Sequence, residues 1–213
     1  MTNFIPIFPL SIIVFPGETL NLHIFEPRYK QLIQECMEQK KPFGIPAVVN
    51  KELKDLGTLI EITAIKQVYE DGKMDISTRG IKVFRLLEVL KEVPDKLYSG
   101  AIVTYPEDED DGKQLLMQQV VKGIKELHKL LEVSKDFKKP EEELKAFDVA
   151  HHMGLNIEEE YELLGLFREA QRQEYLKRHL GKVIPMLTEM ESLKDKVKLN
   201  GHFRNLTSFD FDL

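Results

Sequence analysis

The 213-residue sequence contains a single cysteine, Cys36, and no tryptophan. One thiol excludes an internal disulfide and a cysteine-based zinc cluster, which is typical of proteins in a reducing cytoplasm. Long apolar runs are also missing. The amino terminus has no basic segment, and Pro6, Pro9 and Pro16 interrupt its apolar stretch. It therefore predicts neither a signal peptide nor a membrane span, and we expect a cytoplasmic protein.

The charge is modestly acidic, with a formal net value of -6. Binding to nucleic acid or to an anionic membrane needs a concentrated cationic face, so this composition argues against both as general partners. Apolar residues make up 42% of the chain, which is enough for the core of one large domain or two small ones.

The common catalytic signatures are absent from the sequence. Neither G-x-x-x-x-G-K-[ST] nor G-x-G-x-x-G occurs, so no glycine-rich loop for nucleotide phosphates is predicted. G-x-S-x-G and S-x-x-K are missing as well, so no serine is marked as a nucleophile. We therefore expect no catalytic residue, no metal site and no cofactor.

The pattern from residue 3 to about 105 is that of short antiparallel strands. In TLNLHIF, Leu20, Leu22 and Ile24 alternate with polar residues, which is typical of a sheet with one buried face. The dipeptide at 71–72, Asp-Gly, lies between two apolar runs and predicts a tight hairpin turn. YSGAIVTYPE repeats the alternation. Many short strands in this order favour a small barrel or sandwich, because closing the sheet removes unpaired edges.

One helix is predicted inside this β region. It begins at Pro27, whose missing N–H is not needed in a first turn. Its apolar positions recur with helical spacing at Tyr29, Leu32, Ile33, Cys36 and Met37. Within this stripe, Cys36 is interpreted as a small core residue rather than a reactive thiol.

After the β region the pattern becomes helical. Pro140 and the acidic residues that follow predict a helix that Gly154 ends, and Asn156 with Glu159 resembles a capping box. Pro185 should break or kink the last helix. Two further apolar stripes support a bundle: Leu116, Val120, Ile124, Leu127 and Leu131, then Leu163, Leu164, Phe167, Tyr175, Leu176, Leu180, Val183 and Leu187.

Two charged segments are interpreted as exposed surface. The acidic run EDEDD at 107–111 lacks the spacing of a calcium loop, so a solvated linker is preferred. The second segment mixes both signs on one helix, so an exposed face is preferred over an RNA-binding surface. Its basic members are Arg168, Arg172, Lys177, Arg178 and Lys182, with Glu169 and Glu174 between them.

The pair His151-His152 is the best superficial metal candidate in the sequence. Neighbouring residues of a helix point about 100° apart and cannot chelate a metal from one face, so a structural role is preferred.

The charged cluster HIFEPRY joins the strand at 19–24 to the first helix. Pro27 sets the helix entry, Glu26 lies near the positive end of the helix dipole, and Arg28 and Tyr29 are expected to point back toward the sheet. Glu26 and Arg28 would also suit an acid and an electrophile, but no nucleophile stands at a diagnostic spacing. We therefore interpret the cluster, including His23, as a structural joint.

These segments, in their order, resemble the Lon amino-terminal substrate-binding domain in a stand-alone form. The resemblance rests on IPIFPLSIIVFPGETLNLHIFEPRYKQLIQECM, FGIPAVV, GTLIEITAIKQVYEDGKMDISTRGIKVFRLLEV and YSGAIV, and Gly17 belongs to its FPG signal. It implies an α+β fold: a PUA-like antiparallel β-barrel or sandwich with an inserted helix, followed by an α-helical bundle. The expected boundaries are 1–106 for the β part, 112–200 for the bundle and 201–213 for a tail.

The resemblance also implies a function. A full-length Lon protease continues into an ATPase module and a peptidase module with a serine-lysine dyad, and we expect this chain to end before either. It would then bind unfolded or exposed polypeptide segments without cleaving them, alone or beside a full-length Lon protease. We expect the ligand in an apolar groove between the β part and the bundle. Phe15, Phe25 and Tyr29 are the candidate contacts, although each also fits the core.

Two alternatives remain open. PUA-like folds can bind RNA, which would require a contiguous basic face despite the net acidity. An uncharacterised peptidase would require a polar cleft that contains a strongly perturbed ionisable group.

Overall fold

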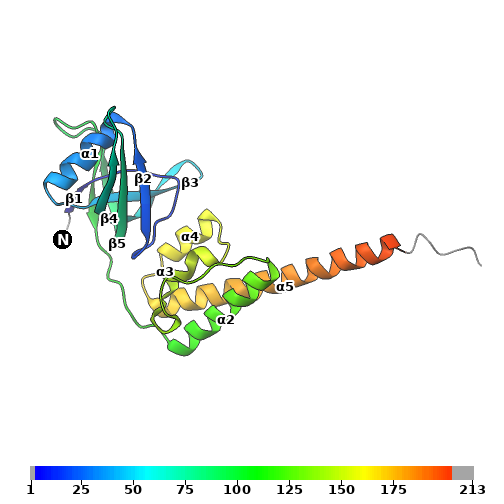
Figure 1. Ribbon diagram of the computed structural model, residues 1–213. Coiled ribbons are helices and arrows are strands. Elements are labelled where there is room, and N and C mark those ends of the chain that lie inside the picture. Colours follow the sequence, from blue (N-terminus) through cyan, green and yellow to red (C-terminus); the bar gives the residue numbers. More distant parts are fainter. Residues whose placement is uncertain (1–2, 203–213) are drawn as a thin grey trace, which may run out of the picture.

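A computed structural model describes residues 3–202, with side chains up to residue 197. It has a β half followed by a helical half, from which the last helix projects (Figure 1). The β half contains β1 (Asn3–Pro6), β2 (Thr19–Ile24), α1 (Pro27–Glu38), β3 (Phe43–Val49), β4 (Glu52–Val68), β5 (Met74–Leu90) and β6 (Gly100–Thr104). The helical half contains α2 (Gln114–Leu130), the 3-10 turn η1 (Glu141–Glu143), α3 (Ala146–Val149), the 3-10 turn η2 (Ala150–His152), α4 (Ile157–Leu164) and α5 (Glu169–His202).

The strands form one antiparallel sheet in the order β1-β6-β5-β4-β3, with β2 paired to β5 off this path. The chain that follows β1 returns to the other edge, where Ile7 bridges Gly44 and Leu10 bridges Ala47 in parallel. These bridges join the first and last strands, so the sheet curls closed. The predicted α+β class with an antiparallel β part is confirmed.

The predicted hairpin at 71–72 joins β4 to β5. Gly72 has a φ of 75°, and the amide of Tyr69 donates to the carbonyl of Lys73 at 2.9 Å. Glycine takes this left-handed conformation without a steric penalty. A second hairpin, between β3 and β4, turns on Asn50 and Lys51, whose φ angles of 53° and 65° are both positive. This turn contains no glycine and was not predicted from the sequence.

Helix α1 has the predicted apolar face. Tyr29, Leu32, Ile33 and Cys36 are all buried, and they pack with residues of β2, β3, β4 and β5 in one core cluster. Pro27 stands at the start of the helix as expected. Because α1 covers one face of the sheet where β2 joins it, this part of the fold gains a second layer.

The segment from Pro140 to Gly154 is not the single helix that we predicted. It consists of η1, the four-residue α3 and η2, and Leu144 between them is extended with a ψ of 134°. The cause is burial: Leu144 is 6% exposed and Met153 1% exposed, both in the core between the helices. Tertiary packing overrides local helical propensity here. Gly154 does end the segment, with a φ of 68°.

Two further helix predictions differ in part from the structure. Leu131 follows the last turn of α2 and is 48% exposed, whereas the other four apolar positions of its stripe are buried. Pro185 does not break α5, which continues to His202. Proline removes one hydrogen bond, to the carbonyl of Gly181, and because Gly181 is exposed, water can satisfy that group. Residues 201–202 therefore belong to α5, and the rest of the predicted tail lies outside the described residues.

One core cluster crosses from the β half into the helices. Phe15 is completely buried in it, and its ring stacks on that of Phe147 of α3 with centroids 5.1 Å apart. From the β half, Ile13, Ala47, Val49, Leu56 and Val83 join it. The place where we expected an apolar groove is therefore filled by core side chains. None of the helices within residues 3–202 combines the length and apolarity that a membrane span would need.

Phe15 and Phe25 offer a matched test of this packing. Replacing a buried phenylalanine by alanine leaves a cavity and typically costs about 3–5 kcal/mol, so Phe15→Ala should lower the free energy of unfolding by that amount. Phe25 is 57% exposed, and Phe25→Ala should change it by less than about 1 kcal/mol. Urea denaturation of both variants measures the difference. Equal losses would contradict the position assigned to Phe15.

Candidate functional site

The HIFEPRY cluster makes local contacts at the start of α1. Arg28 Nε donates to Glu26 Oε2 at 2.8 Å, and its guanidinium lies 4.5 Å from the centre of the Tyr29 ring. Tyr29 stacks on Phe8 with centroids 3.8 Å apart. Tyr29 therefore points into the core as predicted, but the Arg28 side chain is 53% exposed and covers the ring from outside. A guanidinium on an aromatic face is a favourable cation–π contact.

His23 and Gly17 make contacts that fix the chain within β2 and just before it. His23 Nδ1 lies 2.6 Å from Asp75 Oδ1, and the Tyr69 hydroxyl donates to Asp75 Oδ2 at 2.7 Å. Both hydrogen bonds lower the pKa of Asp75, and the one with His23 has the larger effect. Gly17 has a φ of 85°, and its amide donates to the carbonyl of Gly80 at 2.8 Å. The glycine thus lets the loop before β2 turn back onto β5.

The three candidate peptide contacts lie in different environments. Phe15 is fully buried and Tyr29 is 7% exposed, so neither presents its ring to a ligand in this structure. Phe25 is accessible. Its ring lies 6.1 Å from that of His23, which lies 5.9 Å from that of Tyr69. We call Phe25, His23 and Tyr69 the tip patch. It brings together rings from the end of β2 and from the β4–β5 turn.

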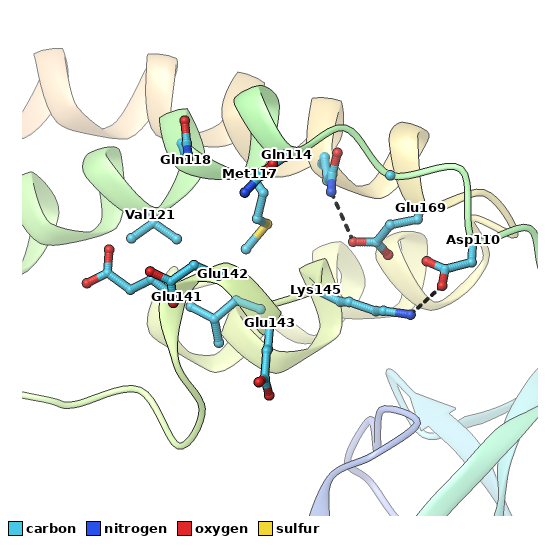
Figure 2. A pocket seen from close by; sticks show the side chains of 13 residues that line it. Asp110, Gln114, Met117, Gln118, Val121, Glu141, Glu142, Glu143, Lys145 and Glu169 are labelled. Atoms are coloured by element: carbon cyan, nitrogen blue, oxygen red, sulfur yellow. Dashed lines mark hydrogen bonds and ion pairs between the residues drawn. The ribbon is translucent and has the colours of Figure 1, made fainter.

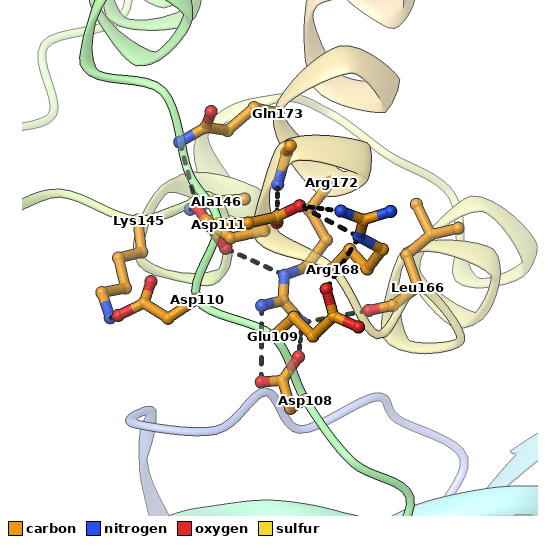
Figure 3. Close-up of polar contacts among 12 residues, drawn as sticks. Asp108, Glu109, Asp110, Asp111, Lys145, Ala146, Leu166, Arg168, Arg172 and Gln173 are labelled. Atoms are coloured by element: carbon orange, nitrogen blue, oxygen red, sulfur yellow. Dashed lines mark hydrogen bonds and ion pairs between the residues drawn. The ribbon is translucent and has the colours of Figure 1, made fainter.

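Residues 107–110 of the acidic run are exposed, as predicted for a solvated segment, but the run is not a free linker, because its side chains form ion pairs (Figure 3). Asp108 pairs with Arg172 at 2.7 Å, Asp110 with Lys145 at 2.6 Å, and Asp111 with Arg168 at 2.6 Å. Asp111 also accepts a hydrogen bond from the amide of Ala170. This hydrogen bond, and to a lesser extent the contact with Arg168, lowers the pKa of Asp111. The run therefore fastens the chain between the two halves to the start of α5.

Arg172 is the centre of this network and is buried, not on an exposed face as predicted. Its side chain is 5% exposed, and its Nε donates to Glu169 Oε2 at 2.9 Å, where the carboxylate is only 2% exposed. The guanidinium also lies 4.3 Å from the centre of the Phe147 ring, and NH1 donates to the carbonyl of Leu166. A buried charge of this kind needs each of these partners.

A cavity of about 460 Å³ lies beside this network (Figure 2). Its apolar part includes Met117 and Val121, and its acidic part is formed by Glu141, Glu142 and Glu143. Glu141 pairs with Lys125 at 2.6 Å. An acidic wall by itself does not define a ligand site, so we treat it as a solvated surface.

The two neighbouring histidines are in opposite electrostatic environments. His151 lies between Glu160 and Glu18, each 3.0 Å from one ring nitrogen, and these carboxylates raise its pKa to about 9. Burial lowers the pKa of His152 to about 4. Within the part of the chain that the structure describes, no group of three or more potential ligands is arranged for a metal ion. Glu18 belongs to the β half, so His151 links the halves, and this contact joins residues too distant in sequence to predict.

Comparison with solved structures identifies the class of fold. The Lon N-terminal domain protein from Xanthomonas campestris has a TM-score of 0.62 at 23% identity, covering 82% of this chain and 96% of that one. The N-terminal domain of the Mycobacterium avium complex Lon protease has a TM-score of 0.60 at 13% identity, covering 85% and 100%. Both share the fold of an α+β domain of the Lon N-terminal type.

The sequence comparison is more specific. The model of the ATP-dependent protease La (LON) substrate-binding domain matches residues 5–182, and the chain belongs to this family. A Lon protease from Parabacteroides distasonis is 32% identical over 133 residues. The match covers 58% of this chain but only 16% of that protease, so this chain corresponds to a small part of its length.

Arg172 and Arg168 test the acidic network. Removing one partner of a buried ion pair leaves the other charge uncompensated and costs about 3–5 kcal/mol, so Arg172→Ala should lower the free energy of unfolding by that order. Arg168 is 51% exposed, and Arg168→Ala should cost less than about 1 kcal/mol. Chemical denaturation at neutral pH measures both. Two equally small losses would show that Arg172 does not carry the network.

His151 predicts a pH dependence of stability. Its pKa is about 9 in the folded chain against 6.5 for an unperturbed imidazole. The folded chain therefore binds the His151 proton more tightly than the unfolded chain does. The stability that this contributes is fully present below pH 6.5, declines as the pH rises and is lost above about pH 9. The difference in unfolding free energy between the native chain and His151→Gln should follow this course. A difference that stays constant from pH 6 to pH 10 would contradict it.

Proposed function

We propose that the chain binds exposed apolar segments of other polypeptides and does not cleave them. The observation that carries this proposal is the tip patch, where the fold leaves Phe25 57% exposed beside two other rings. Aromatic groups that cluster on a surface are typical of protein-binding sites, because they bury a large apolar area at little entropic cost. Membership of a substrate-binding domain family supports the same conclusion.

The structure offers less support for RNA binding. Two arginines of the predicted basic cluster, Arg168 and Arg172, are neutralised by carboxylates of the acidic run. Lys145 is paired with Asp110 in the same way. Since phosphate binding depends on cations that are available to the ligand, these pairs weaken the alternative.

A peptidase would need an activated nucleophile and a base. The Cys36 side chain is buried, and burial is the main cause that raises the pKa of its thiol to about 12. The thiolate is the nucleophilic form, so this cysteine is unreactive at neutral pH. His151, whose pKa is also perturbed, has both ring nitrogens against carboxylates. These contacts favour a structural role.

The proposal includes a cytoplasmic location and a full-length Lon protease as a second partner. A protease of this family carries a related domain, so both proteins would recognise similar segments. If this chain delivers unfolded substrate to the protease, substrate bound to it would be degraded after the protease and ATP are added. If the two proteins only compete for the substrate, this chain would slow its degradation.

Fluorescence anisotropy tests the primary function. The labelled ligand is a reduced and carboxymethylated protein that cannot refold, followed for several hours without ATP. We expect a saturable rise that stays constant. A later fall below the starting value would reveal cleavage and overturn the proposal, as would the absence of any rise. Labelled single-stranded RNA should give no saturable rise at physiological salt.

A pair of variants locates the contact. Phe25→Asp places a charge in the tip patch and should weaken binding by about tenfold, the effect typical of an interface hot spot. Leu115→Asp is the control, because Leu115 is 75% exposed in the first turn of α2. An aspartate is tolerated there beside the positive end of the helix dipole. If Leu115→Asp alone weakened binding, the tip patch would not be the site.

A further inference from the structure

The outer part of β4 has an open edge. Strand β3 pairs with β4 only as far as the pair Phe43↔Ile60, but β4 continues to Val68. Beyond Ile60 it pairs with β5 on one side, and no strand within residues 3–202 pairs with its other side. Half of the backbone N–H and C=O groups of residues 61–68 therefore point outward from the sheet. At the usual rise this edge is about 26 Å long.

Irregular pairing places an apolar strip along this edge. The register between β4 and β5 shifts between Ile62 and Ala64 and again between Ile65 and Gln67. As a result Ile62, Ile65 and Val68, although three residues apart, oppose Thr78, Ile76 and Met74. Ile76 and Met74 face α1 in the core, so the three β4 side chains lie on the same face. We call Ile62, Ile65 and Val68 the edge strip. Ile65 is 39% exposed and Val68 62% exposed.

A hollow of about 420 Å³ adjoins the edge strip. It lies between the end of α1, which contributes Cys36 and Met37, and residues 61–65 of β4. Lys40 and Lys41 line it as exposed side chains, with Glu61 as the opposing charge. The hollow thus combines an apolar wall with a local positive charge in a chain whose net charge is -6.

We propose that the open edge of β4 binds an extended polypeptide segment as an additional antiparallel or parallel strand, with an apolar side chain in the hollow and a carboxylate toward Lys40 and Lys41. The proposal rests on the proposed function and gives its mode of recognition. Outward backbone groups along a sheet edge can be satisfied by another extended backbone. Such pairing depends little on the sequence of the added strand. The hollow selects the side chain, because alternate residues of the added strand face it.

Hydrogen exchange tests the pairing without any mutation. The probe is a labelled eight-residue peptide of alternating valine and threonine with a glutamate at each end. On binding, the outward-facing amides of residues 61–68 should become protected, while those of α5 should not change. The same peptide with N-methyl groups on alternate residues provides the control. Methylation of the residues whose amides face the edge should weaken binding by about tenfold, and methylation of the others should not.

Variants then test the hollow. Ile65→Lys should weaken binding of both the peptide and the unfolded protein by about tenfold. Leu193→Lys is its matched control, because Leu193 is an apolar residue, 59% exposed, on α5, the helix that projects away from the sheet (Figure 1). Exchanging Lys40 and Lys41 for glutamate should weaken binding of this peptide and strengthen binding of a version that ends in lysines. Urea denaturation confirms that each variant folds.

The outcomes separate this inference from the function on which it rests. If the native chain binds unfolded protein but Ile65→Lys binds it equally well and the amides stay unprotected, the edge is not the site and the proposed function stands. If Leu193→Lys alone abolishes binding, the ligand contacts α5 and the inference is wrong. The chain could instead form a dimer that the Ile65→Lys substitution dissociates but the peptide does not. That result would identify a second copy of the chain as the occupant of the β4 edge and overturn the inference. If no unfolded protein binds at all, the proposed function itself fails.

Discussion

The arrangement of the two halves depends on a positive charge that is removed from water. The Arg172 guanidinium is held by Glu169 on its own helix and by Asp108 on the chain between the halves, and it covers the ring of Phe147. The Glu169 carboxylate in turn accepts a hydrogen bond from the amide of Ala146. A buried ion pair contributes little net stability, but its geometry is demanding because every unpaired alternative is costly. It therefore specifies how the helices meet the connecting chain.

Apolar packing completes this junction from the β side. Phe147 lies between Arg172 and Phe15, which the loop before β2 carries into the helical half. His151 adds a third link, because its ring pairs with Glu18 of the same loop and lies 5.3 Å from that of Phe15. One loop of the β half thus supplies both an apolar and a charged contact. With its groove filled in this way, the junction supports the fold, and the surfaces that we propose for recognition lie elsewhere.

Those surfaces are the parts of the β half that the barrel and α1 leave uncovered. The pairing partner of β5 changes from β2 to β6 along its length, and the pairing of β4 with β3 ends at Ile60. The sheet therefore closes at one end and stays open at the other, where the tip patch and the edge strip occur. A closed barrel protects its backbone groups, whereas an open end presents them. The same topology that stabilises the domain leaves this part of the sheet edge accessible.

The sequence by itself determined the features whose causes are local. The capping box of Asn156 and Glu159 forms as predicted because its two hydrogen bonds join residues three positions apart. The turn at Gly72 and the buried face of α1 were predicted for the same reason: each depends on one short segment. The α+β class and the order of a β half before a helical half also followed from the periodicity and from the resemblance to the Lon domain.

Only the tertiary structure decided which charges and rings are buried. The acidic run gave no sign in the sequence of its partners on α5, since Asp108 and Arg172 lie 64 positions apart. For the same reason Phe15 and Phe25 looked equivalent, although one is in the core and the other on the surface. The open edge of β4 was equally invisible, because it depends on where another strand stops pairing. Local periodicity specifies which elements form, but contacts between distant segments determine what those elements leave exposed.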